Sequence, residues 1–278
     1  MPVSDIHQLM REAAANNSAV GAFSVGNMEM VMGAVKASTE SKTPIILQIA
    51  QVRLKTSPLE YMAALMLAAA KKSSTPIAVH FDHGLDENTV YKALSLGFTS
   101  VMLDASLLPF EENIKATKRV VKKAREYGAF VEAELGIVGG SEGGGTAHKI
   151  SCTDPALAAE FCERTGIDAL AIAIGNAHGN YPALPSLRFD ILEEIHNACP
   201  VPLVLHGGTG MTDDMFRKAI SLGIRKINIA TASFDALAKS AKQYTDGAEK
   251  ADYFSLSTQM ADSVYENVKK HIKIFNNR

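Results

Sequence analysis

Three apolar runs of the chain each end in a histidine that is followed by glycine. These runs are Pro76–Gly84, Leu170–Gly179 and Val201–Gly208, and their terminal histidines are His83, His178 and His206. Continuous apolar runs of this length are typical of strands buried on both faces. Polar residues at the carboxyl ends of parallel strands gather at one rim of a sheet or barrel. Three neutral imidazoles with an open fourth position form a catalytic zinc site, so we expect these histidines to converge on a metal.

Other polar residues follow the same rule of position. Each lies at or just after the carboxyl end of an expected strand: His80, Asp82, Asp104, Glu132, Glu134, Asn176, Asn228 and Thr231. A lone histidine in an apolar run is more often a hydrogen-bonded core residue than a metal ligand. Many polar residues on one rim favour the other interpretation, because a metal can satisfy buried groups that would otherwise lack partners.

Glycines after the last two expected strands indicate a phosphate site. His206–Gly210 follows the seventh strand, and Asn228–Thr231 follows the eighth. Many barrels bind phosphate with these two loops and a helix N-terminus. The alternative is an ordinary tight turn. A metal beside a phosphate pocket and several carboxylates suits aldol cleavage, isomerisation or metal-assisted hydrolysis, and spacing alone does not choose among them.

A glycine-rich segment follows the fifth expected strand. Residues 136–148 contain six glycines in thirteen residues, which is unusual for a strand-to-helix turn. We expect a lid over the site, and the alternative is a surface loop without function. The segment is no P-loop, because Gly-Lys-Ser/Thr does not follow it.

Strand-like and helix-like patterns alternate along the whole chain. Eight strands are expected, at Ala19–Val25, Pro44–Ile49, Pro76–His80, Ser100–Leu103, Ala129–Glu134, Ala169–Ile174, Pro202–His206 and Arg225–Ile229. Amphipathic helices are expected between them, at Met28–Ser41, Leu59–Lys72, Asn88–Leu96, Glu111–Tyr127, Pro155–Thr165, Phe189–Cys199 and Thr212–Leu222. A further helix is expected over Asp252–Phe275. This alternation predicts a (β/α)8 barrel with an additional C-terminal helix, occupying residues 1–278 as one domain.

Composition excludes several classes of protein. The chain has 278 residues, 47% of them hydrophobic, with a net charge of −2 and no tryptophan. No basic stripe suggests nucleic acid, and no apolar stretch is long enough for a transmembrane helix. The N-terminus lacks the pattern of a signal peptide. The three cysteines form no CxxC pair, so we expect reduced thiols and a cytoplasmic protein.

Taken together, the motifs resemble one known family. His80–His83, Asp104–Ser106, Val131–Gly136 with Gly139–Glu142, Gly175–Gly179, Leu205–Gly210 and Lys226–Thr231 resemble the class II, zinc-dependent fructose- and tagatose-bisphosphate aldolases. The likeness extends from about Ala19 to Thr231. The chain length, Thr153–Pro155 and the Ala-Thr after Asn228 favour the tagatose-bisphosphate branch.

The resemblance implies roles for individual residues. His83, His178 and His206 would hold Zn²⁺, and Glu134 and Asp104 match acids that lie beside the metal or bind it in an alternative position. Asp82 matches the residue that exchanges a proton with the C4 hydroxyl during carbon–carbon cleavage. Glu142, on the lid, matches the acid that moves the C3 proton of dihydroxyacetone phosphate. The pocket for this ketose phosphate would comprise Gly179, Gly207, Gly208, Thr209, Asn228, Ile229, Ala230 and Thr231.

The resemblance also implies a reaction and its partners. A ketose phosphate or bisphosphate would be cleaved reversibly to dihydroxyacetone phosphate and an aldehyde, with zinc stabilising the enediolate. A monovalent cation, Na⁺ or K⁺, and a homodimer or homotetramer are expected as well. Two alternatives stay open. One is a metal-dependent hydrolase or isomerase on the same barrel, although no His-x-His pair occurs on the first strand. The other is a non-catalytic subunit with a degenerate site.

The chain departs from the family pattern at four positions. Ala105 replaces a common glycine, and Ala50 replaces a serine that lies near a phosphate in fructose-bisphosphate members. Pro182 stands where some members carry a lysine, and Ser141 where some carry an acid. Two of these changes remove contacts to a second phosphate, so we expect an aldehyde other than glyceraldehyde 3-phosphate.

Overall fold

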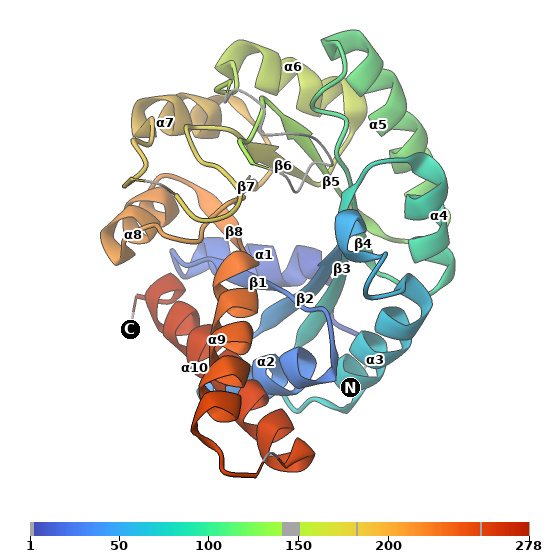
Figure 1. The fold of residues 1–278 in the computed structure, drawn as a ribbon. Coiled ribbons are helices and arrows are strands. Elements are labelled where there is room, and N and C mark those ends of the chain that lie inside the picture. Colours follow the sequence, from blue (N-terminus) through green and yellow to red (C-terminus); the bar gives the residue numbers. More distant parts are fainter. Residues whose placement is uncertain (1–2, 141–150, 182, 251, 278) are drawn as a thin grey trace.

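A computed structural model describes residues 3–140, 151–181, 183–250 and 252–277. Eight parallel strands close into a barrel, because β1 pairs with both β2 and β8 (Figure 1). The strands are β1 Val20–Ser24, β2 Ile45–Ala50, β3 Ile77–Gly84, β4 Ser100–Leu103, β5 Phe130–Leu135, β6 Ala169–Ile172, β7 Leu203–Leu205 and β8 Ile224–Ile229. The predicted (β/α)8 barrel with an additional C-terminal helix is confirmed.

Helices surround this barrel (Figure 1). They are α1 Ile6–Ala15, α2 Met28–Ser41, α3 Leu59–Lys72, α4 Glu87–Ser95, α5 Phe110–Arg125, α6 Pro155–Thr165, α7 Phe189–Ala198, α8 Asp213–Ser221, α9 Thr231–Gly247 and α10 Tyr253–Phe275, with a 3₁₀ turn, η1, at Gln51–Arg53. The helices predicted from periodicity are all present, and α10 packs along α2. Two helices, α1 and α9, were not predicted.

Helix α1 closes one end of the barrel. Its apolar residues Ile6, Leu9, Met10 and Ala13 pack against inward-facing strand residues such as Ile46. This apolar layer fills the amino-terminal end of the barrel. Two residues further along the strands the inward positions become polar, because side chains alternate along a strand. The polar side chains therefore gather at the carboxyl end, where catalytic residues of such barrels lie.

Strand β3 is longer than predicted. The sequence indicated an end at His80, but Ala50 of β2 still pairs with Asp82, and the strand continues to Gly84. Backbone pairing to β2 thus holds these last residues in the sheet although their side chains are polar.

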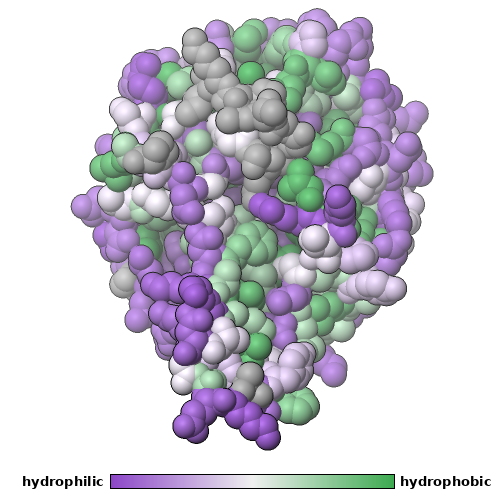
Figure 2. Space-filling view, viewed as in Figure 1, coloured by the Kyte–Doolittle hydropathy of each residue, from purple (hydrophilic) through white to green (hydrophobic). Residues whose placement is uncertain are grey.

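The outer surface is largely polar. Hydrophilic side chains dominate the margins of the face seen in Figure 2, and more hydrophobic ones gather towards its middle. Within the described ranges, no helix is both long enough and apolar enough to cross a membrane.

Candidate active site

A bulge in β3 directs two consecutive side chains into the barrel. Neighbouring residues of a regular strand point to opposite faces, yet Asp82 contacts Asn228 and His83 contacts His206, both on the far side of the barrel interior. The register of β3 against β4 shifts between Phe81 and Gly84, and His83 has a φ of 41°. Such left-handed backbone is costly for a non-glycine residue, and strained residues of this kind cluster at functional sites. The bulge therefore places a carboxylate beside an imidazole.

The three histidines of the His-Gly motifs converge. The His83 ring centroid lies 4.6 Å from that of His206 and 4.7 Å from that of His178. His83 Nε2 and His206 Nδ1 face each other at 2.8 Å. One nitrogen from each of the three rings lies within 4.8 Å of the others, which is a spacing that a metal ion could bridge. The sequence-based expectation that these residues meet is confirmed, although their roles stay predictions.

Backbone contacts hold two of these rings in position. The His178 N–H donates to the Gly139 carbonyl at 2.7 Å, which links the loop after β6 to the loop after β5. The Asn176 amide donates to the His206 carbonyl at 3.0 Å. The loops after β5, β6 and β7 are therefore joined around the histidines.

Two carboxylates flank the histidines. Asp104 Oδ2 lies 2.9 Å from His83 Nδ1 and fixes the orientation of that ring. Glu134 Oε2 lies 3.7 Å from His206 Nδ1 and has no hydrogen-bond partner among the described residues. His83, Asp104 and Glu134 form a second group with the spacing of metal ligands. This arrangement agrees with both carboxylates lying beside the histidines, as the sequence indicated.

The electrostatics of the site favour a bound cation. Burial alone would lower the pKa of His83, but Asp82 and Asp104 raise it to about 10. The carboxylates around His83 therefore favour positive charge at this position, which a bound metal ion would supply. The pKa of His178 is well below its usual value because the ring is buried beside His83, and both of its ring nitrogens lack partners in the described structure. An unprotonated imidazole without a partner fits a metal ligand, so the donor set fits a metal ion.

Asp82 is held by two amide side chains. Gln48 donates to Asp82 Oδ2 at 3.0 Å, and Asn228 donates to Asp82 Oδ1 at 3.2 Å. All three side chains are buried, with Asn228 only 5% exposed. The carboxylate therefore has a defined direction at the rim, beside the histidines, where it could accept or return a proton.

Two further buried residues, Glu132 and Lys226, received no role in the sequence-based prediction, although Glu132 was counted among the polar residues at the strand ends. Glu132 Oε1 lies 2.8 Å from His206 Nε2, and Glu132 Oε2 lies 2.9 Å from the Lys226 ammonium. Burial would raise the pKa of Glu132, but Lys226 and His206 hold it at about 2. The sequence held a signal for Lys226, since it is two residues before Asn228 and must share its inward face.

The loops after β7 and β8 lie side by side. Gly207 has a φ of 65°, and a Cβ atom there would lie 2.1 Å from the Ala177 carbonyl oxygen. The Ala232 N–H donates to Thr209 Oγ1 at 3.1 Å, which ties the start of α9 to the loop after β7. Helix α9 begins at Thr231 without a side-chain cap. Gly207, Gly208 and Thr209 thus lie in the loop next to this helix start, and Gly179 lies in the loop after β6, whereas the Ile229 side chain is buried in the core.

Several predicted positions cannot be placed. Glu142, Ser141 and most of the glycine-rich segment lie outside the described residues, as does Pro182. Ala50 lies at the end of β2 beside Asp82, and its methyl group offers no hydrogen bond there.

The (β/α)8 barrel carries a rim of histidines and carboxylates that could hold a metal ion, an arrangement typical of enzymes. Residues 4–278 match the family model described as fructose-bisphosphate aldolase class-II. The protein YdjI of Escherichia coli K12 is 38% identical over 98% of this chain and 97% of its own. A fructose-bisphosphate aldolase of Staphylococcus aureus is 38% identical over 99% and 98%.

A solved structure agrees with these matches. The crystal structure of the YdjI aldolase superimposes with a TM-score of 0.88 at 36% identity, covering 98% of this chain and 97% of the other. The chain belongs to the class II fructose-bisphosphate aldolase family. The resemblance inferred from the motifs is confirmed at this level, and an aldolase is a lyase that forms and breaks carbon–carbon bonds. The preference for the tagatose-bisphosphate branch stays a prediction.

Proposed function

We propose that this protein is a zinc-dependent aldolase that reversibly cleaves a ketose phosphate or bisphosphate to dihydroxyacetone phosphate and an aldehyde. The convergence of His83, His178 and His206, with both His178 nitrogens lacking partners, is the observation that carries the proposal. Family membership supports the aldolase chemistry.

The three histidines would hold the zinc ion, with Asp104 orienting His83 and Glu134 beside the ligands. When bound, zinc would supply a Lewis acid that stabilises negative charge as the carbon–carbon bond breaks. In the cleavage direction Asp82 takes the proton of the C4 hydroxyl while the C3–C4 bond breaks and its electron pair stays on C3. Gln48 and Asn228 hold the Asp82 carboxylate for this transfer. Glu142, outside the described residues, is proposed to return a proton to C3.

The phosphate of the ketose would bind at the loops after β6, β7 and β8. Gly179, Gly207, Gly208, Thr209 and the segment Asn228–Thr231 are proposed to form the pocket. Support comes from the start of α9, because helix N-terminal N–H groups attract anions. A Na⁺ or K⁺ ion is proposed nearby.

The aldehyde end of the substrate is expected to differ from that of fructose 1,6-bisphosphate. The Ala50 methyl beside Asp82 cannot donate a hydrogen bond to a second phosphate, and Pro182 removes a lysine present in some members. We therefore propose that the aldehyde is not glyceraldehyde 3-phosphate. The configuration at C4, fructose-type or tagatose-type, is left to experiment.

The test is condensation of dihydroxyacetone phosphate with a panel of phosphorylated and unphosphorylated aldehydes. We expect activity with at least one aldehyde, complete loss with a chelator, and recovery with Zn²⁺. Treatment with borohydride in the presence of substrate should not inactivate the enzyme. Irreversible trapping would indicate a Schiff-base lysine and overturn the metal mechanism.

We also propose a homodimer or homotetramer in the cytoplasm, where the three free cysteines would stay reduced.

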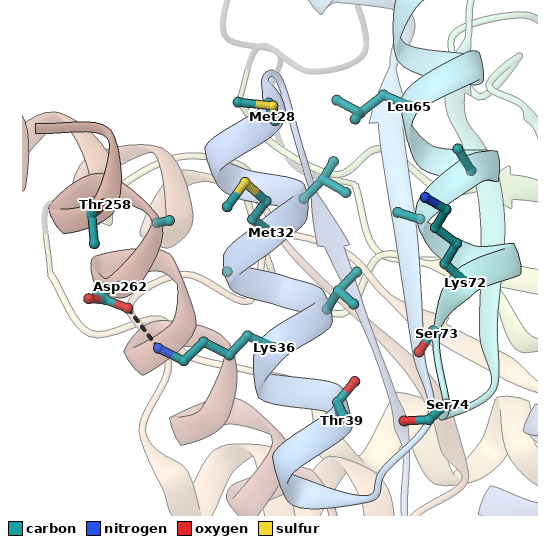
Figure 3. Close-up of a pocket in the computed structure, with 16 residues that line it drawn as sticks. Met28, Met32, Lys36, Thr39, Leu65, Lys72, Ser73, Ser74, Thr258 and Asp262 are labelled. Carbon is teal, nitrogen blue, oxygen red and sulfur yellow. Dashed lines mark hydrogen bonds and ion pairs between the residues drawn. The ribbon is translucent and has the colours of Figure 1, made fainter. Parts of the chain in front are cut away.

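An apolar groove of about 760 Å³ lies between α2, α3 and α10 (Figure 3), and no histidine lines it. Met28 and Met32 line it and are about half exposed, and the still more exposed Phe254 lies on the same helix as the groove residue Asp262. A second copy of the chain could bury both the groove and the Phe254 side chain through one twofold contact. Size-exclusion chromatography with light scattering would measure the mass of the assembly.

A further inference from the structure

A chain of polar groups runs through the completely buried interior of the barrel beneath the three histidines. Lys226 on β8 lies 2.9 Å from Glu132 Oε2 on β5. The other oxygen of Glu132 lies 2.8 Å from His206 Nε2. All three side chains have no exposed surface. Because burying an unpaired charge is very costly, the sequence must retain both charges together or neither.

The chemistry of these groups assigns the proton on His206. The Lys226 ammonium can only donate, and the Glu132 carboxylate beside it can only accept. Nε2 of His206 must therefore carry the hydrogen that Glu132 accepts, which leaves Nδ1 with a free lone pair. Asn228 Nδ2 lies farther from Nε2, at 3.3 Å, and donates instead to Asp82.

The free lone pair points towards the other two histidines. His206 Nδ1 faces His83 Nε2 at 2.8 Å, within the cluster that His178 completes. We propose that Lys226 and Glu132 are positioning residues that fix the tautomer and the ring orientation of His206, so that Nδ1 is presented to the metal. This inference rests on the proposed zinc-dependent function. Hydrogen bonds of this kind to the second nitrogen of a metal-bound histidine strengthen binding.

Lys226 also explains why the metal would bind only in the cluster of His83, His178 and His206. His80, Asp82 and Glu132 form a third group with the spacing of metal ligands, here called the lower group, and all three side chains are completely buried. The Lys226 ammonium already lies against a carboxylate oxygen of this lower group, and His80 Nδ1 is engaged by Ser100 Oγ at 2.7 Å. Lys226 thus takes the place of a cation in the lower group and directs Glu132 towards His206.

The experiment measures zinc retention of the full-length protein, loaded with one equivalent of Zn²⁺ and titrated with a chromogenic chelator. Two variants separate positioning from stability. Lys226→Met with Glu132→Met removes both charges and the acceptor for His206 Nε2 at nearly constant volume, so no charge is left unpaired. Glu132→Asp keeps a negative charge in the neighbourhood of Lys226 but shortens the side chain by one methylene, which draws the carboxylate back from His206. We expect both proteins to hold zinc about 10–100-fold more weakly than the wild type.

Ser100→Ala is the matched control. It removes a buried hydrogen bond from the same layer of the barrel, at His80, and leaves His206 untouched, so zinc affinity should not change. The visible spectrum of the Co²⁺-loaded proteins gives a second readout, because it reports ligand geometry. We expect the spectrum to change in the two test variants and not in the control.

The outcomes separate this inference from the proposed function. Wild-type zinc affinity and an unchanged Co²⁺ spectrum in either folded test variant would overturn the positioning role while leaving the zinc enzyme intact. If circular dichroism shows that the double variant does not fold, Glu132→Asp decides alone. Wild-type protein that binds no zinc would overturn the proposed function and this inference with it.

Discussion

Replacing Asp82 by asparagine should stop turnover and leave the fold and the metal site intact. Asp82→Asn removes the negative charge and the proton-accepting oxygen at the point where the C4 hydroxyl is proposed to lie. The asparagine side chain has almost the same shape as the aspartate, so a change in rate reports the loss of proton transfer and not a change in packing. Positioned acid–base groups contribute about 10²–10⁴ in rate, and we expect kcat to fall by that factor.

The structure indicates that this change costs little stability. Asp82 accepts one hydrogen bond from Gln48 and one from Asn228, so the new amide NH₂ would meet a second donor on one side. Either neighbour can resolve the conflict by an amide flip, because Gln48 Oε1 and Asn228 Oδ1 have no hydrogen-bond partner among the described residues. The net loss should therefore be about 1 kcal/mol, near that of a single hydrogen bond.

The assay follows cleavage and condensation with the best aldehyde of the panel, alongside zinc content and the thermal midpoint. Ser24→Ala is the control, because Ser24 accepts a hydrogen bond from the same Gln48 amide at 3.2 Å and forms none with Asp82 in the described structure. We expect its kcat to stay near that of the wild type. Asp82→Asn protein with full zinc content and a kcat within about tenfold of the wild type would refute the assignment of Asp82 as the proton-transfer residue.

Three further results are expected. Removing the metal with a chelator should lower the thermal midpoint, since a ligand present at 100 times its Kd adds about 2.7 kcal/mol to stability, and calorimetry with and without Zn²⁺ measures the shift. Gly207→Ala should lower the midpoint and raise KM for dihydroxyacetone phosphate, because its Cβ would lie 2.1 Å from the Ala177 oxygen, whereas Gly128→Ala has the same backbone strain but open space around it. Burial beside aromatic rings lowers the pKa of His271 from 6.5 to about 4, so the unfolded chain takes up a proton between these pH values that the folded chain does not. The contribution of His271 to the free energy of unfolding is fully present above pH 6.5 and falls by up to about 3 kcal/mol towards pH 4. Denaturant unfolding of His271→Leu should lack this part of the pH dependence.

Most of the barrel could be predicted from periodicity. The eight strands, the helices between them and α10 each carry an apolar pattern that depends only on local sequence. Helix α1 was missed although Ile6, Leu9, Met10 and Ala13 follow helical spacing. Helix α9 carries a weaker signal, because among its described residues only Ser233 and Ser240 are buried. Its position is determined by packing against α10 and by the loop after β7.

The sequence by itself determined the fold class and the residue types at the strand ends, because buried strands and their lengths can be recognised from the local pattern of apolar residues. It identified His83, His178 and His206 as residues that could meet. Only the tertiary structure decided how they meet. The bulge that turns Asp82 and His83 to the same side depends on the register between β3 and β4. The pairing of Lys226 with Glu132 depends on barrel closure, because β5 and β8 are not neighbours in the sheet and their side chains can meet only across the interior.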